Sequence, residues 1–320
     1  MGKNFAIIGC AGFIAPRHLK AIKETGNNLV AALDKSDSVG ILDKFFEDVH
    51  FFTEFERLDR HAEKLKRIGG KNKIDYVSIC SPNYLHDSHI RFALRIGADA
   101  VCEKPLVINP WNLSSLQKLE EETGKRVYTV LQLRLHPALK ELKKEVEKTD
   151  KIYEIDLTYI TPRGRWYEYS WKGDSSKSGG IATNIGIHFF DMLIWIFGKV
   201  VKQEVHYSDK NKIAGYLELE KARVKWFLSI DRKDLPRDSL NPSFRSIKID
   251  GKELEFSDVF ADLHTEVYKE ILAGRGFGIN DVRPCIELAD RIRQTKPELK
   301  DVEIMHPFLA NHKRNNKNEL

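Results

Sequence analysis

The chain has 320 residues, of which 42% are hydrophobic, enough for one large domain or two ordinary domains with buried cores. Its 52 lysines and arginines nearly balance its 47 acidic residues, and the net charge of +5 is too small to indicate a nucleic-acid partner. These values exclude a peptide hormone, a disulfide scaffold and a disordered tail.

The cysteines and the apolar segments indicate a reducing compartment and no membrane. The cysteines are Cys10, Cys80, Cys102 and Cys285. They are far apart and lack the spacing of a zinc site, so we expect free thiols, no metal and a cytoplasmic protein. The most apolar long stretch, 185–200, contains His188 and Asp191 and is shorter than the roughly 20 residues that cross a bilayer. We therefore expect no membrane segment.

The first part of the chain alternates apolar, β-branched runs with helical stretches. Strands are expected at 4–9, 28–34, 50–52, 75–82, 99–105 and 126–134. Helices are expected at 16–26, 39–46, 54–68, 88–97 and 110–124. This alternation is typical of parallel strands that are buried on both faces and joined by crossover helices. We predict an α/β fold whose first domain, residues 1–134, is a doubly wound Rossmann domain with six parallel strands.

From residue 135 the pattern changes to a charged helix, 136–148, followed by runs that alternate with period two. Strands are expected at 152–161, 200–207, 213–220, 223–231, 244–249 and 253–256, and helices at 181–197, 262–273 and 281–294. We predict a second, α+β domain over 135–311 with a large open, mainly antiparallel sheet, and a polar tail over 312–320. One face of that sheet is available for a homodimer or homotetramer.

A loop of small residues after the first strand is typical of dinucleotide binding. It reads Gly9-Cys10-Ala11-Gly12-Phe13-Ile14 and is followed by a helix that begins near Pro16. Small residues let the backbone approach a pyrophosphate, and the helix N-terminus offers N–H donors. Ala11 takes the place of the middle glycine of G-x-G-x-x-G, so an ordinary tight turn stays an alternative for the loop alone.

Asp34, at the end of the second strand, favours NAD as the cofactor. It follows Gly9 at close to the roughly 20-residue spacing at which an acid binds the adenosine ribose hydroxyls. The same carboxylate would repel a 2′-phosphate, which disfavours NADP.

Two further segments follow the fourth and fifth strands, where open α/β sheets bind their ligands. They are Ser81-Pro82-Asn83-Tyr84-Leu85-His86 and Glu103-Lys104-Pro105. We expect the Lys104 ammonium in the crevice near the nicotinamide, where it could take part in proton transfer. The alternative is a solvated loop lysine.

These motifs together resemble a known family. The dinucleotide loop, Pro82-Asn83-x-x-His86 and Glu-Lys-Pro are followed in order by Gly179-Gly180, Asn184, Gly186, His188 and Asp191. Over essentially its whole length the chain resembles the Gfo/Idh/MocA oxidoreductases, which usually have Asp in place of Asn184. The resemblance implies an NAD-dependent enzyme that acts on a CH–OH group.

A narrower resemblance involves four further segments, 14–18, 131–137, 163–173 and 184–188. They are similar to bacterial UDP-N-acetylglucosaminuronate (UDP-GlcNAcA) 3-dehydrogenases, which also have Asn at the position of Asn184. This implies oxidation of the sugar C3 hydroxyl by NAD during synthesis of the diaminouronic acids of surface polysaccharide, such as the O-antigen of lipopolysaccharide.

The resemblance assigns catalysis to Lys104 and His188, and either of them could be the base. On a regular helix Asn184, His188 and Asp191 share one face, where Asn184 could hold a sugar hydroxyl. The cofactor-binding residues implied are Gly9, Ala11, Gly12, Phe13, Ile14, Asp34, Ser81, Pro82, Asn83, His86, Glu103, Lys104, Gln132, Arg165 and Trp166. The substrate-binding residues implied are Lys104, Arg163, Lys172, Asn184 and His188.

Residues 161–180 suit an anionic ligand that carries rings. Cations outnumber acids there, and the aromatic residues are Trp166, Tyr167, Tyr169 and Trp171. A surface loop whose aromatic residues pack on another subunit stays an alternative. A dehydrogenase of a free sugar or cyclitol would not need the cations, and a non-catalytic NAD-binding regulatory protein would not need both Lys104 and His188.

Overall fold

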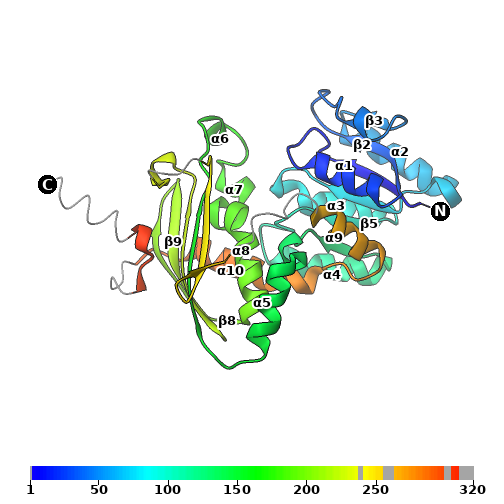
Figure 1. The fold of residues 1–320 in the computed structure, drawn as a ribbon. Coiled ribbons are helices and arrows are strands. Elements are labelled where there is room, and N and C mark those ends of the chain that lie inside the picture. Colours follow the sequence, from blue (N-terminus) through cyan, green and yellow to red (C-terminus); the bar gives the residue numbers. More distant parts are fainter. Residues whose placement is uncertain (1, 237–240, 255–262, 299–303, 310–320) are drawn as a thin grey trace. The chain divides into compact units, whose positions relative to one another are not determined.

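The structure is a computed structural model that describes residues 2–236, 241–254, 263–298 and 304–309. Its internal contacts divide the chain into two compact units (Figure 1). Unit 1 comprises Met1–His136 and Asp258–Arg283, and unit 2 comprises Pro137–Ser257 and Pro284–Leu320. The predicted tail, 312–320, lies outside the described residues.

The core of unit 1 is a six-stranded parallel sheet with the order β3-β2-β1-β4-β5-β6. The strands are β1 (Asn4–Ile8), β2 (Asn28–Leu33), β3 (His50–Phe52), β4 (Tyr76–Ile79), β5 (Asp99–Cys102) and β6 (Val127–Thr129). The order reverses between β1 and β4, and in such sheets ligands bind beyond the carboxyl ends of the strands at that point. The predicted doubly wound parallel sheet is confirmed.

Helices join these strands. They are α1 (Ala15–Glu24), α2 (Phe55–Ile68), α3 (His86–Arg95) and α4 (Trp111–Thr123). The predicted helix 39–46 is only a 3-10 turn, Leu42–Lys44, since a helix this short gains little from its own hydrogen bonds. The predicted strand 126–134 ends at Thr129, and a second 3-10 turn, Gln132–Leu135, follows it.

Helix α9 (Leu263–Leu272) belongs to unit 1, although the sequence analysis assigned this segment to the second domain. Its Tyr268 and Ile271 are fully buried in one core cluster with Phe5 of β1 and Leu19 and Ile22 of α1. Helical periodicity shows that such a segment has an apolar face, but it does not show which sheet that face covers.

The core of unit 2 is a second six-stranded sheet with the order β12-β11-β7-β10-β9-β8. The strands are β7 (Tyr153–Ile160), β8 (Val200–Ser208), β9 (Lys212–Leu219), β10 (Ala222–Ser229), β11 (Phe244–Ile249) and β12 (Lys252–Glu253). β7 and β10 are parallel, and the other neighbours are antiparallel. The sheet is therefore mixed and mostly antiparallel, as expected. Residues 255 and 256 of the predicted last strand lie outside the described residues.

Helix α8 (Ile187–Phe197) covers one face of this sheet. Its Phe190 ring packs on Trp226 of β10 with the ring centroids 5.4 Å apart. Gly186 permits this approach, because an added Cβ would lie 2.6 Å from a methyl group of Leu228. The helical stretch Ser175–Phe197 is long and apolar enough to span a membrane, but 72% of its most apolar window is buried. It has the character of a core helix.

Three further helices and a C-terminal segment belong to the described part of unit 2. The helices are α5 (Pro137–Glu147), α6 (Trp166–Tyr169) and α7 (Ser175–Ser178). Helix α10 (Ile279–Gln294) begins in unit 1 and continues into unit 2. Met305 and Leu309 pack with Phe227 on the sheet face opposite α8, and His306 bonds to Thr158 there.

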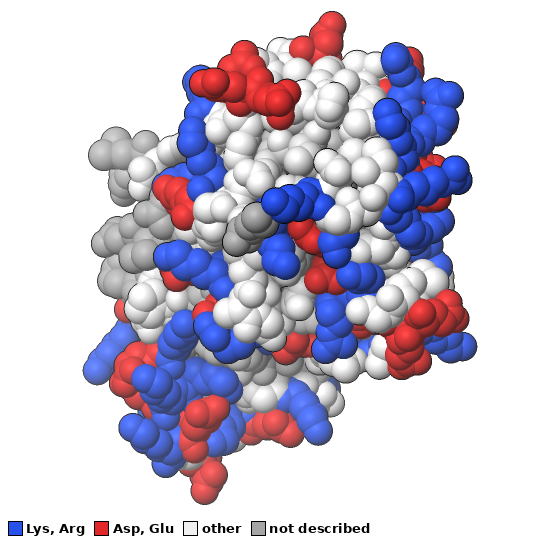
Figure 2. Space-filling model, turned by 90° about the vertical axis from the view of Figure 1, so that its right-hand side faces the viewer, with Lys and Arg blue, Asp and Glu red and all other residues white. Residues whose placement is uncertain are grey.

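Charged side chains of both signs are interspersed on the face of the molecule that Figure 2 shows. This distribution follows from the near balance of 52 basic and 47 acidic residues. A continuous positive field, which would attract a nucleic acid, does not cover that face.

Candidate active site

The predicted site residues of the N-terminal part gather at one edge of the unit 1 sheet. β1, β2, β4, β5 and β6 are parallel, so the segments that follow them all leave the sheet at the same edge. These segments are 9–14, Asp34, 81–86, 103–105 and Gln132. The topology therefore brings together motifs that are far apart in the sequence.

The loop after β1 depends on glycine at its first position. Gly9 has φ 90°, and an added Cβ would lie 2.7 Å from the carbonyl carbon of Cys80. A residue with a side chain would be strained there and would separate β1 from β4. Ala11 and Phe13 are exposed, and the Phe13 side chain is 89% accessible. The loop is thus fixed at its base and open along its outer side.

Asp34 is hydrogen-bonded to this loop. Its Oδ2 accepts a hydrogen bond from the backbone N–H of Ala11 at 2.9 Å, and its Oδ1 accepts one from the N–H of Ser36 at 3.0 Å. Because Asp34 is half-buried, part of the carboxylate still reaches solvent. The carboxylate is therefore held beside the loop in a position that suits ribose hydroxyls.

Three observations show that unit 1 fits a dinucleotide. Helix α1 has no side-chain cap at Ile14 and no acid in its first turn, so its positive end is left for an anion such as a pyrophosphate. Asp34 holds a partly exposed carboxylate beside this loop, where it fits the hydroxyls of a ribose. The Oε1 atom of Gln132 is buried and has no hydrogen-bond partner among the described residues, so this amide can take a further polar group of the ligand.

His86 joins the two loops that follow β4 and β5. Its Nε2 lies 2.8 Å from the carbonyl oxygen of Ser81, and its Nδ1 lies 2.7 Å from that of Pro105. The ring is buried, and burial lowers its pKa, so a neutral ring donates to one of the two carbonyls. Ser81 Oγ is in turn 2.8 Å from Nδ1 of His89. His86 therefore supports the site through the loops that it connects.

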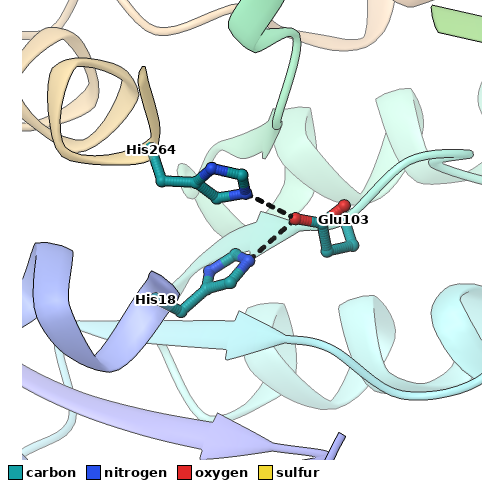
Figure 3. Close-up of side chains that lie close together, drawn as sticks. All are labelled: His18, Glu103 and His264. Carbon is teal, nitrogen blue, oxygen red and sulfur yellow. Dashed lines mark hydrogen bonds and ion pairs between the residues drawn. The ribbon is translucent and has the colours of Figure 1, made fainter. Parts of the chain in front are cut away.

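Glu103 occupies a different environment from the one expected of a cofactor ligand. Its side chain is buried, and Oε1 accepts hydrogen bonds from Nε2 of His18 at 2.9 Å and Nε2 of His264 at 3.2 Å (Figure 3). Its Oε2 accepts the backbone N–H of Lys104 at 3.2 Å. The carboxylate is thus engaged inside unit 1, and the neighbouring Lys104 is only half-buried.

The sequence analysis gave no role to His18 or to His264. His18 stands in the segment 14–18 that carried the narrower resemblance, which was the available signal. The sequence around His264 gives no sign of a role for this residue. His264 comes within hydrogen-bond distance of Glu103 only because α9 packs on α1. Within the described part of the chain, these two histidines and Glu103 form a group whose nitrogen and oxygen atoms are close enough to hold a metal ion, all within 4.8 Å. In the structure each of the two histidine nitrogens is hydrogen-bonded to Oε1 of Glu103.

The predicted helical set of unit 2 is arranged differently from a regular helix. Asn184 lies in a π-helical turn, Ala182–Gly186, and α8 begins only at Ile187. The four-residue spacing to His188 therefore crosses an irregular turn, a feature often found at functional sites. Asn184 and His188 are half-buried, whereas Asp191 is buried. The expected shared face of the three side chains assumed a regular helix and stays a prediction for this irregular segment.

Asn184 contacts a residue that was noted only as an aromatic face. Its Nδ2 donates a hydrogen bond to the hydroxyl of Tyr167 at 3.1 Å. Tyr167 is buried, and burial raises the pKa of its hydroxyl, which therefore keeps its proton. The phenol thus fixes the orientation of the Asn184 amide.

Lys172 lies between two indole rings. Its Nζ is 5.5 Å from the ring centroid of Trp166 and 5.5 Å from that of Trp171. Burial, and then repulsion by Arg163, lower the pKa of Lys172. Arg163 and Arg165 are exposed. The loop therefore presents a partly desolvated cation, two arginines and aromatic surface, which suits an anion with attached rings.

The predicted catalytic and binding residues thus form two groups. Lys104 belongs to unit 1 with the residues of the dinucleotide edge, whereas His188, Asn184 and Lys172 belong to unit 2. The predicted cofactor ligands Arg165 and Trp166 are also in unit 2.

Known proteins with similar sequences include a sugar dehydrogenase and cyclitol dehydrogenases. The chain is 28% identical over 144 residues to D-glucoside 3-dehydrogenase from Escherichia coli strain K12, and 27% identical over 129 residues to inositol 2-dehydrogenase from Rhizobium meliloti strain 1021. These matches cover 44% and 39% of this chain and span only 41% and 37% of the two relatives.

Two family models match most of the chain. The Gfo/Idh/MocA model of an NAD-binding Rossmann fold matches residues 3–131, and the model of the C-terminal alpha/beta domain matches residues 143–233. The expected NAD-binding Rossmann domain is therefore confirmed.

Solved structures extend the likeness over the whole chain. The WlbA (WbpB) dehydrogenase from Thermus thermophilus, solved with NAD and alpha-ketoglutarate, is 51% identical with a TM-score of 0.92, covering 96% of this chain and 99% of that one. The same dehydrogenase was solved with NAD and UDP-GlcNAcA. The WlbA dehydrogenase from Bordetella pertussis, 19% identical with a TM-score of 0.74 over 92% of this chain and 95% of that one, shares the fold. This chain belongs to the Gfo/Idh/MocA oxidoreductase family.

Proposed function

We propose that this protein oxidises the C3 hydroxyl of UDP-N-acetylglucosaminuronate to the 3-keto sugar with NAD. The observation that carries the proposal is the 51% identity, over 96% of this chain, with a Thermus thermophilus dehydrogenase solved with NAD and UDP-GlcNAcA. The cationic, aromatic loop around Lys172 supports the same substrate class, because a nucleotide-sugar acid carries a diphosphate, a carboxylate and rings.

Bound NAD supplies the hydride acceptor. In unit 1 the N-terminus of α1 would hold its pyrophosphate, Asp34 its adenosine ribose and the Gln132 amide a further polar group. Residues Ser81, Pro82 and Asn83 would line the same edge. We assign Arg165 and Trp166, which are exposed in unit 2, to the cofactor as well.

In the proposed mechanism Lys104 and His188 manage the proton of the C3 hydroxyl. Lys104 belongs to unit 1 and His188 to unit 2. Either side chain could accept the proton, and a close pair titrates as a unit. Removal of a proton by a positioned group is worth roughly 100- to 10,000-fold in rate.

The remaining polar residues of unit 2 would bind the substrate. Asn184, oriented by the Tyr167 hydroxyl, would hold a sugar hydroxyl without adding a second negative charge. Lys172 and Arg163 would neutralise the anionic groups. Arg163→Ala should therefore raise KM much more than it lowers kcat, because the arginine binds substrate and transition state alike.

The proposed cellular setting follows from the substrate. The reaction belongs to the synthesis of diaminouronic acids for surface polysaccharide, such as the O-antigen of lipopolysaccharide, and takes place in the cytoplasm. We also propose a homodimer or homotetramer formed through the second face of the unit 2 sheet. Within the described residues, Met305–Leu309 cover one end of that face.

The decisive experiment compares substrates at fixed NAD concentration. Purified protein is mixed with NAD and UDP-GlcNAcA, UDP-GlcNAc, myo-inositol or a glucoside, and the absorbance of NADH is recorded with and without 2-oxoglutarate. UDP-GlcNAcA should reduce NAD, and mass spectrometry should show a product lighter by two hydrogens. UDP-GlcNAc, which lacks the carboxylate, should be a much poorer substrate.

The 2-oxoglutarate arm decides the fate of the reduced cofactor. Free NADH that accumulates without 2-oxoglutarate indicates release, whereas turnover only in its presence indicates reoxidation in place. Efficient oxidation of myo-inositol or of the glucoside, with none of UDP-GlcNAcA, would refute the proposed substrate.

A further inference from the structure

A chain of buried polar side chains runs through the core of unit 1 to Glu103. Ser78 Oγ lies 2.6 Å from the hydroxyl of Tyr268, and that hydroxyl lies 2.7 Å from Nδ1 of His18. His18 Nε2 and His264 Nε2 both reach Oε1 of Glu103 (Figure 3). All five side chains are buried. Strand β4, the loop that follows β5, and helices α1 and α9 each contribute to this network.

One assignment of donors and acceptors satisfies the hydrogen bonds that link Ser78, Tyr268, His18 and Glu103. Burial lowers the pKa of His18, so its ring is neutral and carries one proton. Burial raises the pKa of the Tyr268 hydroxyl well above its usual value, so this group stays protonated and can donate to Nδ1 of His18. His18 then donates from Nε2 to Glu103. Every bond runs toward the carboxylate, with Ser78 at the start.

Glu103 is an anion in this arrangement. Burial alone would raise its pKa, but the hydrogen bonds from His18 and His264 outweigh burial and hold the pKa of the carboxyl well below its usual range. The other titratable groups that act on the network are Arg17, Cys80, Cys102 and His86. A buried carboxylate is costly unless donors satisfy its oxygens, and here Oε1 has two of them.

The second oxygen of this anion is the link to the proposed chemistry. Oε2 accepts the backbone N–H of Lys104 at 3.2 Å, so the carboxylate fixes the peptide from which the Lys104 side chain extends. For stability alone, apolar side chains of similar size would serve these positions as well as a buried ion with its partners. The network instead provides a fixed charge and a fixed backbone directly beside Lys104.

We propose that His18 and His264 are positioning residues for Lys104, which act by holding Glu103 as an anion hydrogen-bonded to the Lys104 peptide. The inference rests on the proposed role of Lys104 in proton transfer. It gives a function to two histidines on separate helices, neither of which is expected to touch the substrate.

The first test is kinetic and uses Glu103→Gln and His264→Gln, with Thr265→Val as the control. Thr265 is a buried residue on the same helix turn, and its hydroxyl donates a hydrogen bond to Glu24, so the control also removes a partly buried hydrogen bond. Misplacement of a catalytic group by about 1 Å can cost on the order of 100-fold in rate. We expect kcat to fall roughly 10- to 100-fold in both test variants, while KM for the sugar and Kd for NADH change about threefold or less. Thr265→Val should keep its kcat.

The second test needs no substrate. Lys104 is half-buried, so acetic anhydride can reach it, and its acetylation rate is measured by peptide mass spectrometry against the exposed Lys118. Loss of the Glu103 anion should leave a larger fraction of the Lys104 amine unprotonated and reactive. Loss of the hydrogen bond to the Lys104 peptide should make the side chain more mobile. Acetylation of Lys104 should therefore be faster in Glu103→Gln and His264→Gln than in the unchanged protein between pH 7 and pH 9, and unchanged in Thr265→Val.

Separate outcomes refute the two proposals. If the unchanged protein does not oxidise UDP-GlcNAcA, the proposed function fails, and the acetylation rates alone decide the role of the network. If both test variants only lower Tm, with unchanged kcat and unchanged Lys104 acetylation, the network is structural. If Glu103→Gln does not fold, the test rests on His264→Gln. In that variant the Glu103 carboxylate still accepts the hydrogen bond from His18. If EDTA abolishes activity and a divalent ion restores it through these histidines, they bind a metal and the positioning role is wrong.

Discussion

The exchange of Asp34 for asparagine tests the cofactor site most directly. In the structure both carboxylate oxygens accept backbone N–H groups, from Ala11 at 2.9 Å and from Ser36 at 3.0 Å. Asparagine has nearly the same shape but only one acceptor oxygen and no charge. Its amide nitrogen would face one of the two N–H donors, so the variant loosens the loop and also loses the anion that binds the ribose.

The expected change in affinity follows from the hydrogen bonds that are lost. A hydrogen bond to a charged group is worth about 1.5–3 kcal/mol, which corresponds to a roughly 10- to 150-fold weaker Kd for NADH. NADPH should gain affinity, because its 2′-phosphate no longer meets a like charge. The ratio of the Kd for NADPH to the Kd for NADH should therefore change by a larger factor than the Kd for NADH does.

Calorimetric titration at fixed ionic strength measures both constants. Asp37→Asn is the matched control, since Asp37 is an exposed acid in the same loop and the same charge is removed from the protein. It should leave the ratio unchanged. Equal affinities of the unchanged protein for NADH and NADPH, or an Asp34→Asn variant that behaves like Asp37→Asn, would refute the assignment.

Three further predictions concern catalysis, substrate binding and stability. Lys104→Met or His188→Ala should lower kcat by roughly 100- to 10,000-fold with NAD binding intact, and in steady-state assays the double variant should be little worse than the poorer single one. Lys172→Met should raise KM for UDP-GlcNAcA about 10-fold or more, because a partly desolvated cation between two indoles is lost, whereas Lys177→Met, at an exposed lysine of the same segment, should not. Burial lowers the pKa of His306 to about 3, while the unfolded chain takes up this proton near pH 6.5. The native state should therefore lose stability as the pH falls from about 6.5 toward 3, by at most roughly 5 kcal/mol, and His306→Gln should flatten the plot of Tm against pH.

Patterns in the amino-acid sequence were sufficient to predict the fold class and the sheet edge that carries the dinucleotide motifs. Apolar strands that alternate with helices are typical of a parallel sheet. The hydrophobic periods of strands and of helices can both be read from neighbouring residues. Parallel order then places the ends of β1, β2, β4, β5 and β6 at one edge, whatever the details of packing. The loop from Gly9, Asp34 and the Glu-Lys-Pro segment were therefore identifiable before any contact was known.

The packing of α9 and the hydrogen-bond partners of Glu103 could not be predicted from the sequence. The amphipathic pattern of α9 is equally compatible with either sheet, and only its burial against α1 brings His264 within 3.2 Å of Glu103. The π-helical turn at Asn184 was likewise not predicted, because the sequence analysis assumed a regular helix over 181–197. Local periodicity specifies elements and their order. Contacts between elements distant in sequence depend on how complementary surfaces fit, and this fit determines which polar groups become buried together.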